Sequence, residues 1–295
     1  DNRCRIAQHI KIMYRYPSNF NVLSNATAII VHSDHSRKLA KEWYSNSREL
    51  DWERIPLLRA EPVSMDKQQV RIELDIPDKT ILICSFGILD SSKLNHMLID
   101  ALGKLKENLK TKIKMVFVGE LGGNYKQTIE SLINKYNLQA VVEVTGWASD
   151  TLYRQYLAAA DIGVQLRALS RGETSAAVLD CMNYGLATIV NANGSMAELP
   201  DDRIIKLADE FIIDDLISAI GYLCENKAFR ENLGHSAHLY ISEKHNPSIC
   251  AQSCFQHIEA AYSKAGIAVN DIINRINITD RECEHYATLL AANFP

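Results

Sequence analysis

The sequence predicts a doubly wound α/β domain, in which helices cover both faces of a parallel sheet. Short apolar runs alternate with longer amphipathic segments, and this alternation repeats six times between Thr80 and about Asn226. The runs are rich in β-branched residues and continuously apolar, which indicates strands buried on both faces. Most of them end in Gly, Ser or Asn, the residues that favour turns.

Each expected element follows from its local pattern. Leucine, isoleucine and methionine recur on one stripe of the segments 93–108 and 125–136, as in amphipathic helices. From about residue 207 onward the pattern is wholly helical, and the last helix is expected from about Asp280, where Thr279 and Glu282 have the spacing of a capping box. The proline-containing, charged segment 57–79 is interpreted as an interdomain linker. The expected strands are 28–31, 81–86, 115–118, 141–144, 162–165, 188–190 and 204–206, and the later helices are 211–225, 227–245 and 248–265.

Composition and charge exclude several classes of protein. The 295 residues include 32 Lys and Arg against 36 Asp and Glu, a net charge of −4. A mildly acidic chain without a basic run is a poor candidate for binding nucleic acid. No apolar stretch approaches the ~18 residues of a membrane span. Seven scattered cysteines without a C-x-x-C pair are typical of a reduced, cytoplasmic protein. Because no H-E-x-x-H, histidine cluster or D-x-D pattern occurs, we expect no metal, and no cofactor is expected.

Ligands of open parallel sheets bind beyond the carboxyl ends of the strands, so the loops there are the candidate sites. After the strand 81–86, Gly87 allows a tight turn, and Lys93 falls in the first turn of the next helix. A cation there opposes the helix dipole, and a bound phosphate would remove the conflict. A solvated lysine is an equally good interpretation. After the strand 115–118, Gly119 permits close approach of a ligand, although a flexible turn explains it as well.

The densest polar stretch lies between the strand 162–165 and a helix that begins near Ala176. Its two hydroxyl residues are natural helix N-caps. Asp180 lies among apolar neighbours in the following helix, and a carboxylate there is costly unless it meets a partner. Glu173 and Asp180 are seven residues apart, about two helical turns, which would place both carboxylates on one side of a pocket. The alternative is a surface loop with an ion pair between Arg171 and Glu173. The candidate residues of this stretch are Arg167, Arg171, Glu173, Thr174, Ser175 and Asp180.

A fourth loop follows the strand 188–190. It contains Gly194 and Ser195, and its Asn-Gly-Ser sequence can present consecutive N–H groups to an anion. The same sequence is also a common tight turn. Four loops of this kind at one edge of a sheet predict one phosphate-bearing ligand.

On these motifs the chain resembles the group 1 glycosyltransferases of the GT-B fold, which use nucleotide-sugar donors. The resemblance covers about residues 80–245 and implies the Rossmann-like, donor-binding C-terminal domain of that fold, followed by C-terminal helices. The family's Gly-Arg-Leu…Lys-Gly opening resembles Gly87-Ile88-Leu89…Lys93-Leu94, and its Val-Gly-x-Gly turn resembles Val118-Gly119 and the glycines that follow. Its Tyr-x-x-Ala-Asp motif resembles the segment 156–161, and the end of its double-glutamate signature aligns with residues 185–188.

The resemblance also implies roles for individual residues. Lys93 would hold the donor diphosphate, and Asp180, in place of the family's second glutamate, would contact the ribose. The family's first glutamate falls at Gly172, so the neighbouring Glu173 would meet the hydroxyls of the donor sugar. The family's arginine is replaced by Ile88, and Arg167 or Arg171 would supply its charge.

The activity that the resemblance implies is transfer of a sugar from a nucleotide-diphosphate sugar to an acceptor hydroxyl. Such enzymes usually retain the anomeric configuration and need no metal. Their acceptors are saccharides or lipid-linked saccharides, and their usual setting is polysaccharide biosynthesis in the cytoplasm, at the inner face of the membrane, with loose membrane attachment. The alternatives are a non-catalytic nucleotide-sugar binder, which Ile88 and Gly172 favour, and a nucleotide-sugar epimerase of the same architecture. The helices expected after Lys206 disfavour a flavodoxin-like or response-regulator protein.

We expect three parts along the chain. Residues 1–65 would be the remnant of an N-terminal acceptor-side domain plus linker, 66–265 the donor-binding domain, and 266–295 a C-terminal helical extension. The segments 28–33 and 38–44 are similar to the last strand and helix of the family's N-terminal domain. One strand and one helix cannot close a core. We therefore expect a piece of a longer enzyme, with little activity alone and a tendency to self-associate.

Overall fold

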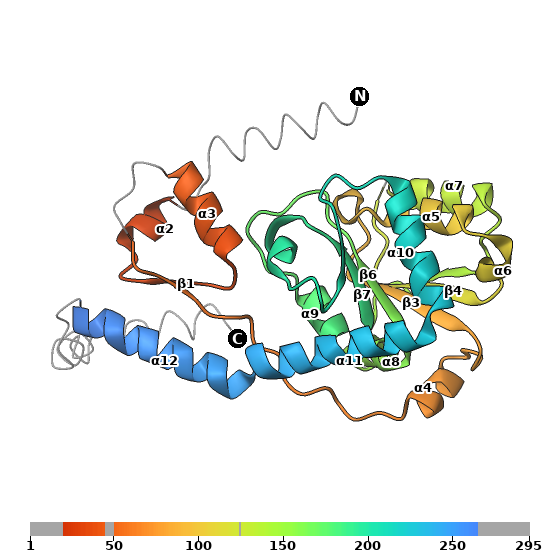
Figure 1. Ribbon diagram of the computed structural model, residues 1–295. Helices are drawn as coiled ribbons and strands as arrows, with labels where there is room; N and C mark the ends of the chain where they lie inside the picture. The colour runs from red at the N-terminus through yellow and green to blue at the C-terminus, as the bar shows by residue number, and fades with distance from the viewer. Residues whose placement is uncertain (1–19, 45–49, 124, 265–295) are drawn as a thin grey trace, which may run out of the picture. The chain divides into compact units, whose positions relative to one another are not determined.

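The computed structural model describes residues 20–44, 50–123 and 125–264 (Figure 1). The chain divides into two compact units. The larger unit consists of Val31–Trp43 and Arg54–Cys250 and contains the main sheet. The smaller unit takes its described residues from the ranges 1–30, 44–53 and 251–295.

The larger unit is built on a parallel sheet of six strands, which confirms the predicted fold class. The strands lie in the order β5-β4-β3-β6-β7-β8, and every neighbouring pair is parallel. The order reverses between β3 and β6, and this switch point is where open α/β sheets bind ligands. The strands are β3 (Ile81–Phe86), β4 (Ile113–Val118), β5 (Val142–Val144), β6 (Ile162–Gln165), β7 (Ala187–Asn191) and β8 (Ile205–Leu207), each close to its expected position.

Helices cover both faces of this sheet (Figure 1). Side chains alternate between the faces along each strand. In β3, Ile83 packs with one group of helices, whereas Leu82 and Cys84 pack with the other. The first group is α5 (Asn95–Lys104), α7 (Tyr125–Lys135) and α10 (Ile213–Glu225), and the second is α4 (Lys67–Glu73), α8 (Asp150–Ala159) and α9 (Ala176–Asn183). The helix α11 (Lys227–Lys244) packs on α9 and β7.

The expected linker 57–79 is partly wrong, because it contains α4. Asp66 caps this helix by accepting a hydrogen bond from the backbone N–H of Gln69. Arg71, which is only 4% exposed, donates hydrogen bonds to the carboxylate of Asp161 and to the carbonyl oxygens of Ala159 and Pro77. A linear sequence reveals the charge of Arg71 but not the buried acceptors that it meets across the fold.

The helix expected over 93–108 is shorter and interrupted. A 3-10 turn, η1 (Ser91–Lys93), precedes α5, and Leu94 between them has a φ of 53°. Lys93 therefore lies before the helix rather than in its first turn. Downstream, the backbone of Leu105 is extended, and the short helix α6 (Glu107–Lys110) follows.

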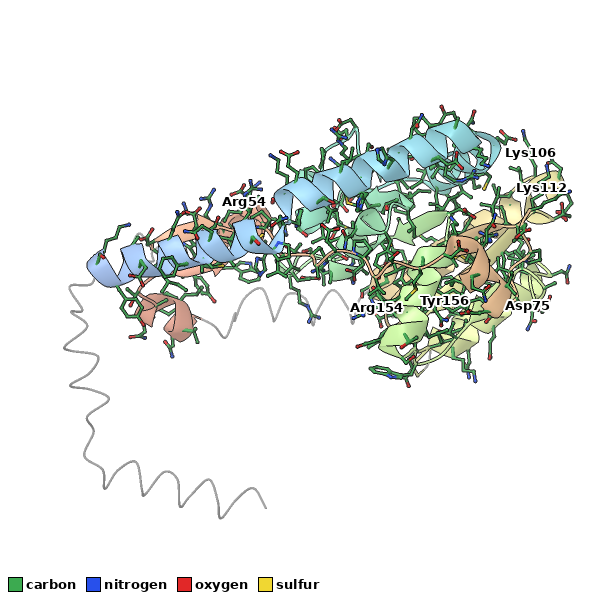
Figure 2. All side chains as sticks on the ribbon, turned by 90° about the horizontal axis from the view of Figure 1, so that it is seen from below. Arg54, Asp75, Lys106, Lys112, Arg154 and Tyr156 are labelled. Atoms are coloured by element: carbon green, nitrogen blue, oxygen red, sulfur yellow. The ribbon has the colours of Figure 1, made fainter. Side chains whose placement is uncertain are left out.

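The amino edge of the sheet carries scattered charges of both signs. Lys106, Lys112 and Asp75 are exposed and point outward from the segments that precede β3 and β4 (Figure 2).

The described part of the smaller unit is small. It includes α2 (Phe20–Asn25) and portions of β1 (Ile29–Val31), β2 (Trp52–Arg54) and α12 (Pro247–Lys264). β1 pairs with β2, a strand that the sequence analysis missed because its residues are not an apolar run. The helix expected from about Asp280, and two of the cysteines, Cys4 and Cys283, lie outside the described residues. None of the helices described here is long and apolar enough to cross a membrane.

Candidate functional site

The candidate site lies at the switch point, where the loops after β3 and β6 meet. The backbone N–H of Ala168, after β6, donates a 2.7 Å hydrogen bond to the carbonyl oxygen of Ser92 in η1. The N–H of Gly87 donates a 3.0 Å bond to the carbonyl oxygen of Val118, the last residue of β4. Three of the expected loops are therefore joined at one place.

Two glycines shape the floor of the site. Gly87 has a φ of 99°, and a Cβ there would lie 2.7 Å from the Lys93 Nζ. The backbone of Gly119 packs directly against the carbonyl group of Gly87, so closely that a Cβ at Gly119 would overlap it. Glycine is required at both positions, and Lys93 folds back over the first of them.

Lys93 and Arg167 form a pair of neighbouring cations. Burial and the nearby positive charge of Arg167 lower the pKa of Lys93 to about 8. Burial also lowers the pKa of Arg167, which the carboxylate of Glu173 opposes. Among the described residues, no carboxylate lies within ion-pair distance of either cation. Two partly buried cations without a close counter-ion favour the binding of an anion.

Asn191, the last residue of β7, holds Arg167 in place. Its side-chain Oδ1 accepts a 2.8 Å hydrogen bond from the backbone N–H of Arg167, and its Nδ2 donates a 2.7 Å bond to the carbonyl oxygen of the same residue. Asn191 is completely buried. The sequence analysis did not identify it, since nothing in the sequence joins two residues so far apart in the chain.

Glu173 lies in the loop before α9 and not on the helix. Its carboxylate accepts a 2.7 Å hydrogen bond from the backbone N–H of Arg171, so the alternative of a side-chain ion pair between these two exposed residues is not realised. Gly172 has a φ of 101°, a conformation that glycine adopts readily and glutamate does not. The backbone therefore disfavours a carboxylate at Gly172 itself and allows one at Glu173.

The loop around Gly194 and Ser195 supports Glu173 from β7. The hydroxyl of Ser195 donates a 2.9 Å hydrogen bond to the carbonyl oxygen of Glu173. Gly194 has a φ of 60° and packs so closely on the side chain of Ser170 that no Cβ would fit. These residues belong to the 3-10 turn η2 (Gly194–Glu198), and through them this turn contacts the loop that carries Glu173.

The expected N-caps behave differently from the prediction. Ser175 is the N-cap residue of α9 by position, but its side chain makes no capping hydrogen bond. The side-chain oxygens of Thr174 and Ser175 are both buried and have no partner among the described residues. Buried hydroxyl groups without partners are costly, and a ligand could satisfy them.

Asp180 belongs to a second polar cluster. It lies on α9, 3.0 Å from the Nε of Arg59, and its other carboxylate oxygen accepts a 3.0 Å hydrogen bond from the hydroxyl of Tyr153 on α8. Burial raises the pKa of Asp180, which Arg59 and Tyr153 oppose. A pocket of about 390 Å³ adjoins these three residues and Arg154. The sequence analysis missed Arg59 and Tyr153 because neither follows a strand.

The two clusters meet at the end of β3. The ring of Tyr153 lies 5.1 Å from that of Phe86, which directly precedes Gly87. The helical spacing argument for Glu173 and Asp180 is wrong, because Glu173 precedes the helix. The structure thus groups Gly87, Lys93, Gly119, Arg167 and Glu173, with Gly194 and Ser195 packed against the loop that carries Glu173. Thr174 and Ser175 follow Glu173 with buried hydroxyl groups that lack a partner within the described residues, the Arg171 side chain is exposed, and Asp180 lies in the adjoining cluster.

Within the described residues, no group of three or more His, Cys, Asp or Glu side chains is arranged to hold a metal ion.

Solved structures share this fold at low sequence identity. Sucrose-phosphate synthase from Thermosynechococcus elongatus matches 83% of this chain with a TM-score of 0.71 and 20% identity. The Anabaena protein HepE in complex with UDP-glucose matches 81% of this chain with a TM-score of 0.71 and 18% identity. The C-terminal domain of LpcC, a group 1 family glycosyl transferase from Francisella tularensis, matches 63% of this chain with a TM-score of 0.56 and 18% identity.

This chain covers 60% of the sucrose-phosphate synthase chain and 66% of the HepE chain, but it covers 96% of the LpcC domain. A search of curated protein sequences finds no match. The family pattern described as "Glycosyl transferases group 1" matches residues 66–239, which is more than half of the chain and contains both polar clusters except Arg59. The chain therefore belongs to the group 1 glycosyl transferases.

Proposed function

We propose that this chain binds a nucleotide-diphosphate sugar at the switch point and acts in a glycosyltransferase that transfers the sugar to an acceptor hydroxyl. The observation that carries the proposal is the pair of partly buried cations, Lys93 and Arg167, beside the half-buried turn at Gly87. A diphosphate supplies the negative charge that these groups lack. The UDP-glucose bound in HepE, a structure of the same fold, supports this choice of ligand.

The charge arrangement also suits the chemistry of the transfer. When the bond from the sugar to the diphosphate breaks, negative charge develops on the leaving phosphate. Lys93 and Arg167 are positioned to stabilise that charge, and stabilisation of this kind is usually the largest contribution to catalysis. Glu173, close enough to Arg167 to affect its pKa, would bind the sugar hydroxyls, and Asp180 would bind the ribose. We extend the proposal to retention of anomeric configuration without a metal, as the family resemblance implies.

We further propose a saccharide or lipid-linked acceptor and a role in polysaccharide biosynthesis in the cytoplasm, at the inner face of the membrane. These statements rest on the family resemblance, and they are tested separately from donor binding.

A nucleotide panel tests donor binding. Thermal-shift and calorimetric titrations of the whole chain with UDP, GDP, ADP and their sugars should identify one responding base. Lys93→Ala should weaken that response, whereas Lys106→Ala, which removes an exposed lysine at the opposite edge of the sheet, should leave it unchanged. No response to any nucleotide, or equal responses of the two variants, would contradict the proposal.

Product analysis tests the reaction. Incubation of the full-length gene product with the responding donor and saccharide acceptors should release the nucleoside diphosphate and form a glycoside. Proton NMR should show the donor's anomeric configuration in the product, also in the presence of EDTA. Binding without transfer or donor hydrolysis would indicate a non-catalytic binder instead. A free 2-epimer formed without acceptor would indicate an epimerase.

A further inference from the structure

A second cavity lies in the larger unit, between α3 (Asp34–Trp43) and η2. Its volume is about 680 Å³, and no residue of the Lys93–Arg167 cluster lines it. His35, Lys38 and Lys41 of α3 form one wall, and Gly194 and Ala197 of η2 belong to the other. The proposed donor site therefore leaves this cavity unused.

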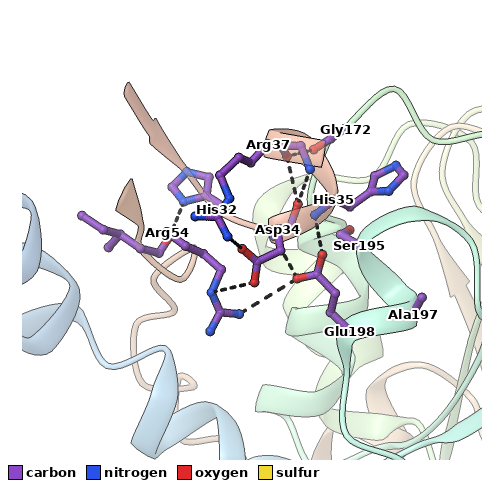
Figure 3. A network of polar contacts seen from close by, with 12 residues as sticks. His32, Asp34, His35, Arg37, Arg54, Gly172, Ser195, Ala197 and Glu198 are labelled. Atoms are coloured by element: carbon purple, nitrogen blue, oxygen red, sulfur yellow. Dashed lines mark hydrogen bonds and ion pairs between the residues drawn. The ribbon is translucent and has the colours of Figure 1, made fainter. Parts of the chain in front are cut away.

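Two acidic side chains of this cavity, Asp34 and Glu198, are already engaged. Glu198 accepts hydrogen bonds from the backbone N–H groups of Asp34, at 3.1 Å, and His35, at 2.5 Å (Figure 3). Asp34 pairs with Arg37 at 2.6 Å and with Arg54 at 3.5 Å. Glu198 thus supplies the negative charge that the amino end of α3 favours, and these two carboxylates cannot also neutralise a cation elsewhere in the cavity.

Two lysines of the cavity are not engaged in this way. Lys38 and Lys41 are one helical turn apart and therefore share a face of α3. No carboxylate of the described residues lies within ion-pair distance of either side chain, although Glu42 also lines the cavity. A single glutamate can offset only one of the two lysine charges, so the wall of α3 retains positive charge.

The cavity adjoins the loop that carries Glu173. The hydroxyl of Ser36 donates a hydrogen bond to the carbonyl oxygen of Gly172, and Ser195 bonds to Glu173 from the η2 side. A Cβ at Gly194 would lie 3.5 Å from the imidazole of His35, whose Nε2 is buried and has no hydrogen-bond partner among the described residues. The cavity and the proposed donor site thus share the loop 170–173 as a common boundary.

From these observations we infer that the cavity between α3 and η2 binds the acceptor, and that this acceptor carries an anionic group, either a phosphate or a carboxylate. Lys38 and Lys41 bind the anion, and the Nε2 of His35 hydrogen-bonds to a polar group of the same molecule. The inference rests on the proposed function, since it supplies the second substrate of the transfer.

The experiment compares matched sugar probes on the whole chain. Glucose 6-phosphate, glucuronate and neutral glucose are titrated in the presence of the responding nucleotide, and binding is followed by saturation-transfer NMR and calorimetry. The two anionic probes distinguish a phosphate from a carboxylate requirement. We expect at least one of them to bind about tenfold or more tightly than glucose, and less tightly at high salt, because charge attraction between accessible groups is screened.

The Lys38→Ala/Lys41→Ala double variant should abolish this preference for the anionic probe and leave the Kd for the nucleotide within about twofold of the wild type. The matched control is Lys106→Ala/Lys112→Ala, which removes two exposed lysines at the amino edge of the sheet and should change neither affinity. His35→Ala should lower the affinity for the anionic probe that the wild type prefers, while the affinity for the nucleotide stays the same.

The outcomes separate the two proposals. Nucleotide binding with equal affinity for glucose and both anionic probes would overturn the acceptor inference and leave the donor proposal standing. An anionic preference that persists in Lys38→Ala/Lys41→Ala, or that is lost equally in the control, would also overturn it. Absence of nucleotide binding in the wild type would overturn the proposed function and this inference together.

Discussion

Two polar clusters adjoin the end of β3, and they differ in how their charges are balanced. In the cluster of Arg59, Tyr153 and Asp180, the carboxylate has a cation at 3.0 Å and a hydroxyl donor at 3.0 Å. In the other cluster, burial disfavours the charge of both Lys93 and Arg167, and the charge of Arg167 further disfavours that of Lys93. No carboxylate of the described residues is within ion-pair distance of either cation. The carboxylate of the first cluster already has a counter-ion within the protein, whereas the cations of the second are left for the phosphates of a ligand.

This difference has an energetic consequence. A partly buried ion pair loses stability when one partner is removed, because the other is left unpaired. A partly buried cation without a partner carries a cost of its own, so its removal relieves the free protein and harms only ligand binding. The predictions below use this contrast, from the largest expected effect to the smallest.

The largest effect is expected for Lys93→Met. The affinity for the responding nucleotide should fall about 100-fold, equivalent to about 2.7 kcal/mol, because a charge-assisted contact to the diphosphate is lost. The free protein should unfold at the same temperature as the wild type or higher, since a desolvated cation has been replaced by an apolar side chain of similar length. Calorimetric titration and thermal melts measure the two quantities. A clear loss of stability with unchanged affinity would reverse the assignment of the two clusters.

The complementary substitution is Asp180→Asn. It should lower the free energy of unfolding by about 2 kcal/mol, because Arg59, whose side chain is 14% exposed, loses its counter-ion. In a double-mutant cycle with Arg59→Met, the second substitution should cost much less than it does alone. Denaturant unfolding of the four proteins measures this coupling. Additive effects would show that the pair contributes little to stability.

The pH dependence of binding sharpens the comparison further. Lys93, with a pKa of about 8, loses its charge as the pH rises, so nucleotide affinity should fall about tenfold between about pH 7 and pH 9. The stability of the free protein should change with pH in the opposite direction. The unfolded chain keeps Lys93 protonated to higher pH than the folded one, so stability should rise with pH between about 8 and 10.5. Titrations across this range check both trends. In Lys93→Met, the contribution of residue 93 to the pH dependence of both affinity and stability should disappear.

The smallest effect is expected for Ser175→Ala. Loss of an N-cap side chain usually costs about 0.5–2 kcal/mol, but this hydroxyl makes no capping bond and is buried without a partner among the described residues. The substitution should therefore change stability by less than about 0.5 kcal/mol. Substitution of Asp66 by Ala, which removes a cap that is formed, is the control and should cost about 1 kcal/mol. Equal costs for the two variants would show that Ser175 caps the helix after all.

Much of the fold could be predicted because it depends on local pattern. The continuous apolar runs of β3 and β4 and the stripes of α5 and α7 identify buried strands and amphipathic helices without knowledge of their partners. The prediction was wrong where a local signal was overridden, as in α4, whose buried Arg71 depends on acceptors from the segments around Asp161 and Pro77. It was also wrong at Leu94, whose left-handed backbone interrupts the expected helix.

The sequence by itself determined the fold class and the loops in which a ligand site must lie, because hydrophobic periodicity and strand-end residues act over a few positions of chain. Only the tertiary structure decided which of the predicted residues share a cluster. Lys93 and Arg167 meet because the strand order reverses between β3 and β6. Asp180 of α9 pairs with Tyr153 of α8 and with Arg59 of the segment before α4 because the fold brings these three segments together. Charge balance at each residue is a property of these long-range neighbours, and no spacing along the chain encodes it.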